Sequence, residues 1–177
     1  MKQKLSIQIE YKIVDGGVSI TKLHGRCAEI RIPEEIHGMP VIEIGERAFS
    51  VKEELPVADS MDEWEAEIAF VTEAPAEVAE GQALRRVFLP DSIETIGAYA
   101  FHGCSALERV SLPAKLQEIS LRMFDGCASL EQITLPAGLK SIGDYAFYGC
   151  GSLRKLHLPE SVERIGKYAF YNCRKME

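Results

Sequence analysis

The chain has 177 residues, 46% of them hydrophobic, and a net charge of −7 at pH 7. This length suits a single domain. Residues 51–83 hold ten acidic residues and one lysine, or −9, and subtracting this from the total leaves +2 for the rest of the chain. Nucleic acid is excluded as the main partner, because phosphate binding needs clustered lysine and arginine. The apolar runs are too short for a membrane span.

The N-terminal segment predicts a β-hairpin. Residues 4–14, "KLSIQIEYKIV", alternate apolar and polar side chains, "DGG" follows as a turn, and residues 18–23, "VSITKL", continue the pattern. We expect residues 1–26 to form a hairpin that caps a repeat domain at its first coil. The segment lacks the continuous apolar stretch of a signal peptide, so the chain as written is expected to be cytoplasmic.

The acidic segment 51–83 is predicted to be a helical insert after a degenerate first coil at residues 27–50. Ser60 to Glu63 form a capping box, and Met61, Trp64, Ile68 and Val71 follow at helical spacing. Three interpretations stay open. The apolar stripe of this insert docks on the rest of the domain, or Trp64 and its acidic neighbours bind a partner, or the segment is disordered.

Residues 84–175 consist of four units of equal length, which begin at Leu84, Leu107, Leu130 and Leu153. Numbered from these leucines, positions 1, 4, 6, 10 and 13 are apolar, and position 7 is always proline. Position 18 is always phenylalanine: Phe101, Phe124, Phe147 and Phe170. A fixed period in this range indicates a solenoid in which each unit is one coil. Identical positions should therefore lie over one another in a continuous core.

The spacing also predicts local structure within each coil. Positions 4 and 6 share one face of a strand, which proline ends, so positions 3 and 5 should point away from the core. Glycine at position 14 indicates a tight bend or a close backbone approach, and Gly or Asn at position 20 indicates positive φ. The expected fold is a solenoid with a parallel β ladder along one side and short helical or 3-10 turns elsewhere.

The repeat resembles the BspA-like leucine-rich repeat family, whose 23-residue pattern is LxxIxLPxxLxxIgxxAFxxC. Residues 28–49 look like the opening unit of that family, and the second full unit departs from the pattern at Ser120 and Met123. The resemblance implies one leucine-rich repeat domain over residues 1–177 in a bacterial protein. It also implies a solenoid of the α/β class that forms a right-handed superhelix, with the parallel β ladder on its concave face. Such proteins are often secreted or displayed on the cell surface, where they bind host proteins or mediate adhesion. This location is an alternative to the cytoplasm.

The residues give no sign of catalysis or metal binding. One cysteine stands at position 21 of each unit: Cys104, Cys127, Cys150 and Cys173. Four stacked coils spread these thiols over roughly 14 Å, too far for one zinc ion. Neighbouring thiols would lie within disulfide range, but cysteines beside core phenylalanines are expected to be buried and free. No metal-binding histidine spacing or catalytic motif is present. We expect no enzyme activity, no cofactor and no metal.

Two surfaces are candidates for binding. The first combines positions 3 and 5 of the four units: Arg86, Phe88, Arg109, Ser111, Gln132, Thr134, Lys155 and His157. This basic stripe suits an acidic protein partner or glycan; the alternative is a solvated sheet face without a partner. The second surface is a ridge of tyrosines: Tyr99, Tyr145, Tyr148, Tyr168 and Tyr171. These rings either form a binding surface or pack coil upon coil. Trp64 in the acidic insert is a separate candidate.

Protein–protein interaction, with a partner the sequence does not identify, is therefore the expected function. Carbohydrate binding through the tyrosine ridge is one alternative. An intracellular scaffold or a self-assembling structural protein is another, because the last coil has no cap in the sequence. An open coil favours pairing with a second chain, so a weak homodimer through the C-terminal coil is also expected.

Overall fold

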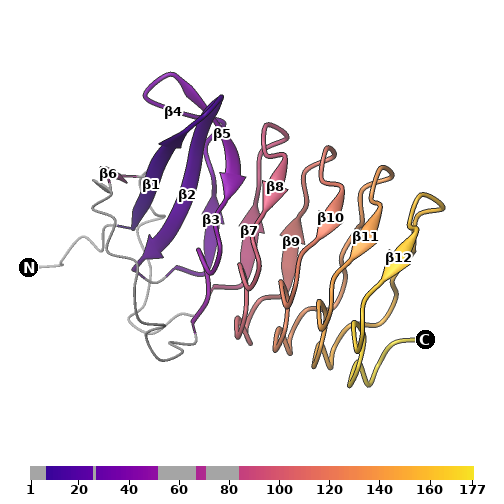
Figure 1. The fold of residues 1–177 in the computed structure, drawn as a ribbon. Coiled ribbons are helices and arrows are strands. Elements are labelled where there is room, and N and C mark those ends of the chain that lie inside the picture. The colour runs from indigo at the N-terminus through magenta and orange to yellow at the C-terminus, as the bar shows by residue number, and fades with distance from the viewer. Residues whose placement is uncertain (1–6, 26, 52–66, 71–83) are drawn as a thin grey trace, which may run out of the picture.

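The computed structural model describes residues 7–25, 27–51, 67–70 and 84–177, and Figure 1 shows their coils side by side along the molecule. All named elements in these residues are strands. The N-terminal strands are β1 Gln8–Val14, β2 Gly17–His24, β3 Glu29–Arg31, β4 Glu35–Ile36, β5 Met39–Ile44 and β6 Glu67–Phe70. The repeat strands are β7 Arg86–Phe88, β8 Thr95–Ile96, β9 Arg109–Ser111, β10 Glu118–Ile119, β11 Ser141–Ile142 and β12 Arg164–Ile165.

The N-terminal hairpin lies against the first coil. Strands β1 and β2 pair antiparallel, with Val14 opposite Gly17, and β2 pairs parallel to β5. The amide of Leu23 also donates a hydrogen bond of 2.9 Å to the carbonyl of Ala48. These bonds cover the outer edge of the first coil along β5 and at Ala48, whereas β3 is the edge strand of its own sheet.

Residues 67–70 differ from the prediction of a helical insert. They form β6, which pairs antiparallel to β1 with Ile68 opposite Glu10. The helical spacing through Ile68 therefore does not correspond to a helix at this point, because the segment has the edge of β1 available for pairing. The capping box, Trp64 and Val71 lie outside the described residues.

Each repeat contributes to two parallel ladders instead of the single ladder that was expected. The first ladder joins β3, β7 and β9, and the bridge between Gln132 and Lys155 continues it. The second ladder lies at positions 12 and 13. It pairs β8 with β5, and separately joins β10, β11 and β12. The proline at position 7 ends the first strand, and the chain pairs again only five positions later.

The expected helical or 3-10 turns are also wrong for the described residues, in which no helix occurs. The segment from position 15 to position 20 is a series of turns instead. Position 16 has positive φ although it carries a side chain: 59° at Tyr99, 50° at Arg122, 56° at Tyr145 and 54° at Tyr168. Position 20 also has positive φ, as predicted, at Gly103, Gly126, Gly149 and Asn172. Two left-handed residues within five positions prevent a continuous helix.

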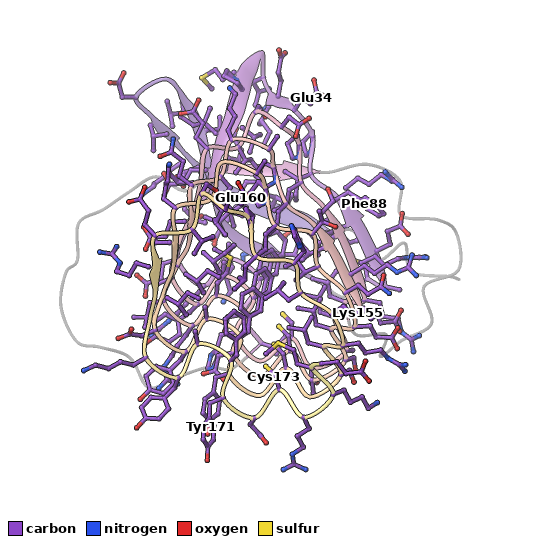
Figure 2. The ribbon with its side chains drawn as sticks, turned by 90° about the vertical axis from the view of Figure 1, so that its right-hand side faces the viewer. Glu34, Phe88, Lys155, Glu160, Tyr171 and Cys173 are labelled. Atoms are coloured by element: carbon purple, nitrogen blue, oxygen red, sulfur yellow. The ribbon has the colours of Figure 1, made fainter. Side chains whose placement is uncertain are left out.

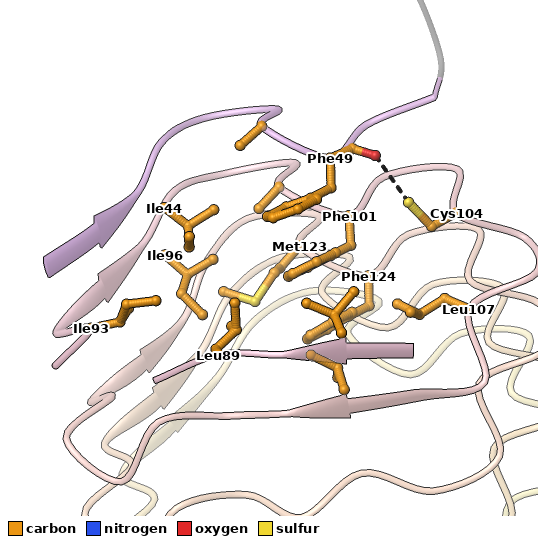
Figure 3. Close-up of a cluster of buried hydrophobic side chains, with 14 of the residues drawn as sticks. Ile44, Phe49, Leu89, Ile93, Ile96, Phe101, Cys104, Leu107, Met123 and Phe124 are labelled. Carbon is orange, nitrogen blue, oxygen red and sulfur yellow. Dashed lines mark hydrogen bonds between the residues drawn. The ribbon is translucent and has the colours of Figure 1, made fainter. Parts of the chain in front are cut away.

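The core is a single column of stacked side chains. The ring centroids of Phe49, Phe101, Phe124, Phe147 and Phe170 lie 5.0, 5.3, 5.3 and 5.4 Å apart in order. Adjacent rings are nearly parallel, at 4–15°. Figure 3 shows the first three of these rings with apolar side chains from both sides of the coils packed around them: Ile44, Leu89, Ile93, Ile96 and Leu107. The prediction that identical positions lie over one another is confirmed.

Glycine at position 14 permits the close approach of successive coils. A Cβ atom added to Gly97 would lie 2.6 Å from the Glu46 nitrogen, and one added to Gly166 would lie 2.4 Å from the Asp144 nitrogen. Both distances are far shorter than any real Cβ contact. The second ladder can therefore close only where position 14 has no side chain, which makes Ser120 in the second unit an informative exception.

Candidate functional site

The predicted basic stripe lies on the outer face of the first ladder. Seven of its eight side chains are exposed, and Phe88 is half-buried. Parallel pairing places Arg86 beside Arg109 and Phe88 beside Ser111, and the bridge places Gln132 beside Lys155. Figure 2, viewed from the C-terminal end, shows Phe88 and Lys155 on the same side of the stack. The structure thus brings these residues of four units onto one continuous face.

The charges on this face are not equivalent. Arg86 is held by Glu29 of the neighbouring β3, at 2.9 Å, and Glu29 also lies 3.3 Å from Arg31. Arg31 in turn stacks over the ring of Phe88, 3.9 Å from its centroid. Within the described residues, Arg109 and Lys155 form no ion pair. The N-terminal part of the face is therefore partly neutralised by Glu29, whereas the positive charge farther along the stack is available to a partner.

The tyrosine ridge lies on another side of the stack, toward which Tyr171 points in Figure 2. Tyr145 stacks on Tyr168 at 5.3 Å, and Tyr148 stacks on Tyr171 at 5.4 Å. Tyr168 and Tyr171 remain 58% and 57% exposed, while the inner tyrosines are half-buried. The inner rings thus pack coil upon coil, as one of the two interpretations predicts, and binding through the two exposed rings stays a prediction.

The second unit interrupts the ridge with charged residues that are largely enclosed. Arg122 replaces tyrosine and stacks over Tyr145, 4.4 Å from the ring centroid. Its guanidinium lies 2.8 Å from the carboxylate of Asp125, which also lies 3.5 Å from Nε2 of His102. The side chains of His102 and Asp125 are only 5% and 8% exposed. This cluster was missed by the sequence analysis, although His102 and Asp125 both stand at position 19 of adjacent units.

The cysteines bond the coils to one another without disulfides. All five are free, and Cys104, Cys127 and Cys150 are buried, whereas Cys173 is half-buried. Each position-21 thiol donates to the phenylalanine carbonyl of the preceding coil, at 3.1–3.2 Å. Figure 3 shows the first of these bonds, from Cys104 to Phe49. Since only a protonated thiol can donate, the cysteines act here as structural hydrogen-bond donors.

Burial keeps these thiols protonated. Desolvation raises the pKa of Cys104 to about 12. It also raises the pKa of Cys127 well above its ordinary value, and the neighbouring thiols add to this shift. A thiol that resists ionisation is a poor nucleophile and a poor metal ligand. Within the described part of the chain, no group of three His, Cys, Asp or Glu side chains is placed to hold a metal ion.

A hollow on the described surface lies between β8 and β10, where the second ladder is interrupted. In the other units the amide at position 14 donates to the preceding coil, as from Gly143 to Ile119 at 2.7 Å. Ser120 makes no such backbone bond, and its hydroxyl donates to the carbonyl of Ile96 instead. Its side chain occupies the space in which the other coils make backbone contact, so the coils separate here.

The resulting groove has a volume of about 610 Å³. Its lining combines apolar and polar side chains: Glu94, Thr95, Ile96, Lys115, Leu116, Gln117, Glu118 and Ser120. The ion pair between Lys115 and Glu94, at 3.6 Å, joins its two sides. The sequence identifies Ser120 as a departure from the repeat pattern, but the altered hydrogen bonding and the groove appear only in three dimensions.

The repeat matches a known protein family. The family model for the BspA type leucine-rich repeat region matches residues 75–177, in six copies. The chain belongs to the BspA-type leucine-rich repeat family. No curated protein matches it significantly, and no described helix is long and apolar enough to cross a membrane.

Solved structures of leucine-rich repeat proteins share the fold. A leucine-rich repeat protein of T. pallidum is 31% identical, with a TM-score of 0.74 over 99% of this chain and 68% of that one. A protein from Bacteroides ovatus is 27% identical, with a TM-score of 0.72. A leucine-rich cell surface protein from Faecalibacterium prausnitzii is 26% identical, with a TM-score of 0.71. The chain covers 39% and 36% of these last two.

Replacing Ser120 with glycine should close the groove. Without a side chain at position 14, the amides of Gln117, Glu118 and residue 120 can bond to the first unit as their equivalents do elsewhere. We expect the exchange of these amides with deuterium to slow by at least about tenfold, which corresponds to one protected hydrogen bond of about 1.4 kcal/mol. The matched variant Gly143→Ser should accelerate exchange one coil further along. Unchanged exchange in both variants would contradict this account of the interruption.

Thiol alkylation should distinguish Cys173 from the buried cysteines. We expect iodoacetamide at pH 8.5 to modify Cys173 in the folded protein and Cys127 only after unfolding, because burial raises the pKa of Cys127 and blocks access. Burial makes the thiol pKa higher in the folded protein than in the unfolded protein. The contribution of this burial to the free energy of unfolding is therefore fully present below the ordinary thiol pKa of about 8.5, and it declines as the pH rises above that value. Mass spectrometry of labelled peptides measures the first effect; equal labelling of both residues would contradict it.

Proposed function

We propose that this protein is a non-enzymatic protein-binding module that binds through the outer face of the first ladder. The observation that supports this most is the arrangement of Arg86, Arg109, Gln132 and Lys155, which follow one another in register along four coils. A rigid row of exposed side chains at a fixed spacing suits an extended or flat protein surface. The buried, protonated thiols and the missing catalytic motifs favour binding over catalysis.

The charge of this face indicates the chemistry of the partner. Arg109 and Lys155 are exposed and form no ion pair among the described residues, so their charge is available for recognition. We propose an acidic protein surface as the partner, since complementary charge accelerates association and selects among partners. The half-buried ring of Phe88 adds apolar contact area at the N-terminal end of the same face.

The shape of the stack is proposed to support this role. Parallel strands joined by a crossover connect with right-handed geometry in almost all proteins. We therefore propose a right-handed superhelix with the first ladder on its concave face. A concave face surrounds its ligand on more than one side, and extended concave surfaces are what stacked repeats use for binding.

A bacterial source and a location at the cell surface, with a role in adhesion or host-protein binding, are also part of the proposal. They rest on family membership and on the similar cell surface protein of Faecalibacterium prausnitzii. An intracellular scaffold is the alternative. Protease treatment of intact source cells, followed by immunoblotting, tests the location: loss of the protein supports surface display, and full protection supports the scaffold.

The exposed faces of Tyr168 and Tyr171 support a second candidate, carbohydrate binding. Aromatic rings offer apolar area with a hydroxyl at one edge, which suits the mixed surface of a sugar. A glycan array with the wild-type protein and the Tyr168→Ala variant tests it. Glycan binding that the variant loses would favour this candidate over protein binding.

The main proposal is tested by charge reversal on the sheet face. The variant Arg109→Glu/Lys155→Glu should weaken binding of affinity-captured partners by at least tenfold, or about 1.4 kcal/mol, because it places negative charge opposite an acidic surface. The matched control is Lys12→Glu/Lys115→Glu, which changes the net charge equally at two exposed positions off this face. Circular dichroism should show that both variants fold. If the two variants capture the same partners equally well, the assignment of the binding face is wrong.

A further inference from the structure

The backbone of the second full unit lacks hydrogen bonds that the other described units make. The amide at position 14 donates at 2.7 Å to the preceding strand in all four units that have glycine there: Gly45, Gly97, Gly143 and Gly166. The amide of Ser120, at the same position, has no backbone acceptor among the described residues. The interruption therefore leaves a strand edge open inside the stack, in the groove between β8 and β10.

Two further amides beside Ser120 also lack acceptors. In the third unit the amides of Lys140 and Ser141 converge on one carbonyl, that of Gln117, at 2.7 and 3.2 Å, and the fourth unit repeats this geometry. In the second unit the equivalent amides belong to Gln117 and Glu118 and the equivalent carbonyl to Glu94, and these groups do not bond to one another. Two converging donors thus face one acceptor across the groove.

This arrangement selects the chemical group that fills it. A trans secondary amide presents its carbonyl oxygen and its N–H in opposite directions. Between the two coils, such a group accepts from Gln117 and Glu118 with its oxygen and donates to the carbonyl of Glu94 with its N–H. A carboxylate satisfies only the two donors, and it places negative charge against the Glu94 carbonyl oxygen. The other coils follow the same rule, because peptide carbonyls occupy the equivalent place in them.

The strand geometry extends the match to a second peptide group. The amides of Glu118 and Ser120 are two residues apart on the same strand edge, so they lie about 6.6 Å apart along it. Carbonyls two residues apart in an extended peptide repeat at the same spacing. The groove volume of about 610 Å³ lies within the range of roughly 300–1,000 Å³ that is usual for ligand pockets. A short extended segment therefore matches the groove in spacing and in size.

The side chains around the groove indicate what this segment carries. The charged groups in its lining are the carboxylates of Glu94 and Glu118 and the ammonium group of Lys115, a net charge of −1. Lys115 lies 3.6 Å from Glu94, whereas Glu118 forms no ion pair among the described residues. Ile96 and Leu116, each 2% exposed, supply the apolar part of the lining. A basic side chain on the segment can pair with Glu118 and pack its aliphatic stem on apolar surface.

We propose that this groove is a second binding site, which takes an extended peptide segment with a basic residue next to the peptide group that bridges the two coils. The site differs in place and in charge from the outer face of the first ladder. The first ladder selects an acidic surface, whereas the groove selects a basic segment. The inference is independent of the binding face proposed above, because none of the residues that carry it belongs to the first ladder.

Ser120 keeps this site open. A Cβ atom at position 14 overlaps the preceding coil wherever that position is glycine, as 2.6 Å at Gly97 and 2.8 Å at Gly143 show. The variant Ser120→Gly should let the two coils bond to each other, so that the chain's own carbonyls fill the site. The matched variant Ser120→Ala keeps the Cβ atom that separates the coils and removes only the hydroxyl. Binding should therefore survive in Ser120→Ala and be lost in Ser120→Gly.

Nuclear magnetic resonance with a small peptide tests the site directly. The probe is the blocked tripeptide acetyl-Ala-Lys-Ala-amide, titrated to about 20 mM into the nitrogen-15-labelled 177-residue chain. We expect saturable shifts of the amide signals of Gln117, Glu118 and Ser120. The affinity should fall by at least about tenfold in Ser120→Gly and stay within about threefold in Ser120→Ala. No saturable shift at these amides, or equal affinity of the two variants, would overturn the proposal.

Two further probes test the chemistry of the segment. The acidic tripeptide acetyl-Ala-Glu-Ala-amide should bind at least about threefold more weakly than the basic one. The variant Glu118→Lys should abolish this difference, whereas the control Glu160→Lys, at an exposed position in the last unit, should keep it. Sodium acetate should cause no saturable shift at the three amides. Saturation by acetate, or equal affinity for the two tripeptides, would overturn the assignment of a basic peptide segment.

Discussion

The close stacking of identical positions is the constraint on which the rest of this structure depends. One coil cannot bury its own apolar side, so each coil is stable only against its neighbour. Offset aromatic stacking contributes roughly 0.5–1.5 kcal/mol per pair beyond area burial, and here it repeats four times, from Phe49 to Phe170. The thiol ladder follows from the same geometry, since position 21 reaches the carbonyl of the preceding phenylalanine in every coil. Any binding surface therefore lies on the outside of the stack, because these side chains fill its interior.

A single departure from the repeat shows how narrow this constraint is. Glycine at position 14 lets two backbones approach so closely that a Cβ atom would overlap the preceding coil. Ser120 adds that atom, and the second ladder divides into two sheets at that point, while the first ladder and the turn side stay bonded. The same unit replaces two tyrosines of the ridge with Arg122 and Asp125. The second unit thus differs from its neighbours on two sides while keeping its place in the core.

Sequence patterns predicted the features that depend on burial and period, and missed those that depend on hydrogen bonding between coils. Recurrence of Phe101 and its equivalents predicted the core column, and proline at position 7 predicted the end of the first strand. The second ladder occupies only positions 12 and 13 of each coil, too short a stretch for a periodic signal. Tyrosine and arginine are not residue types that indicate positive φ, so nothing in the sequence indicated this conformation at Tyr99 and Arg122. The sequence therefore predicted helical turns where the structure has non-helical ones. The pairing of His102 with Asp125 was available in the sequence, because both occupy position 19.

Register along the stack is the central claim, and deletion of a whole unit tests it most directly. Removal of residues 107–129 takes out one complete unit, joins Ala106 to Leu130 and places Gly143 against the first unit. The account predicts a folded protein with one cooperative urea transition and an uninterrupted second ladder. Removal of residues 107–118 alone leaves this unit without its first strand and without its apolar positions 1, 4, 6 and 10, so the later coils cannot stack in register on the first unit and cooperative unfolding of the stack should be abolished. A cooperative transition in the second variant, or its absence in the first, would contradict the account.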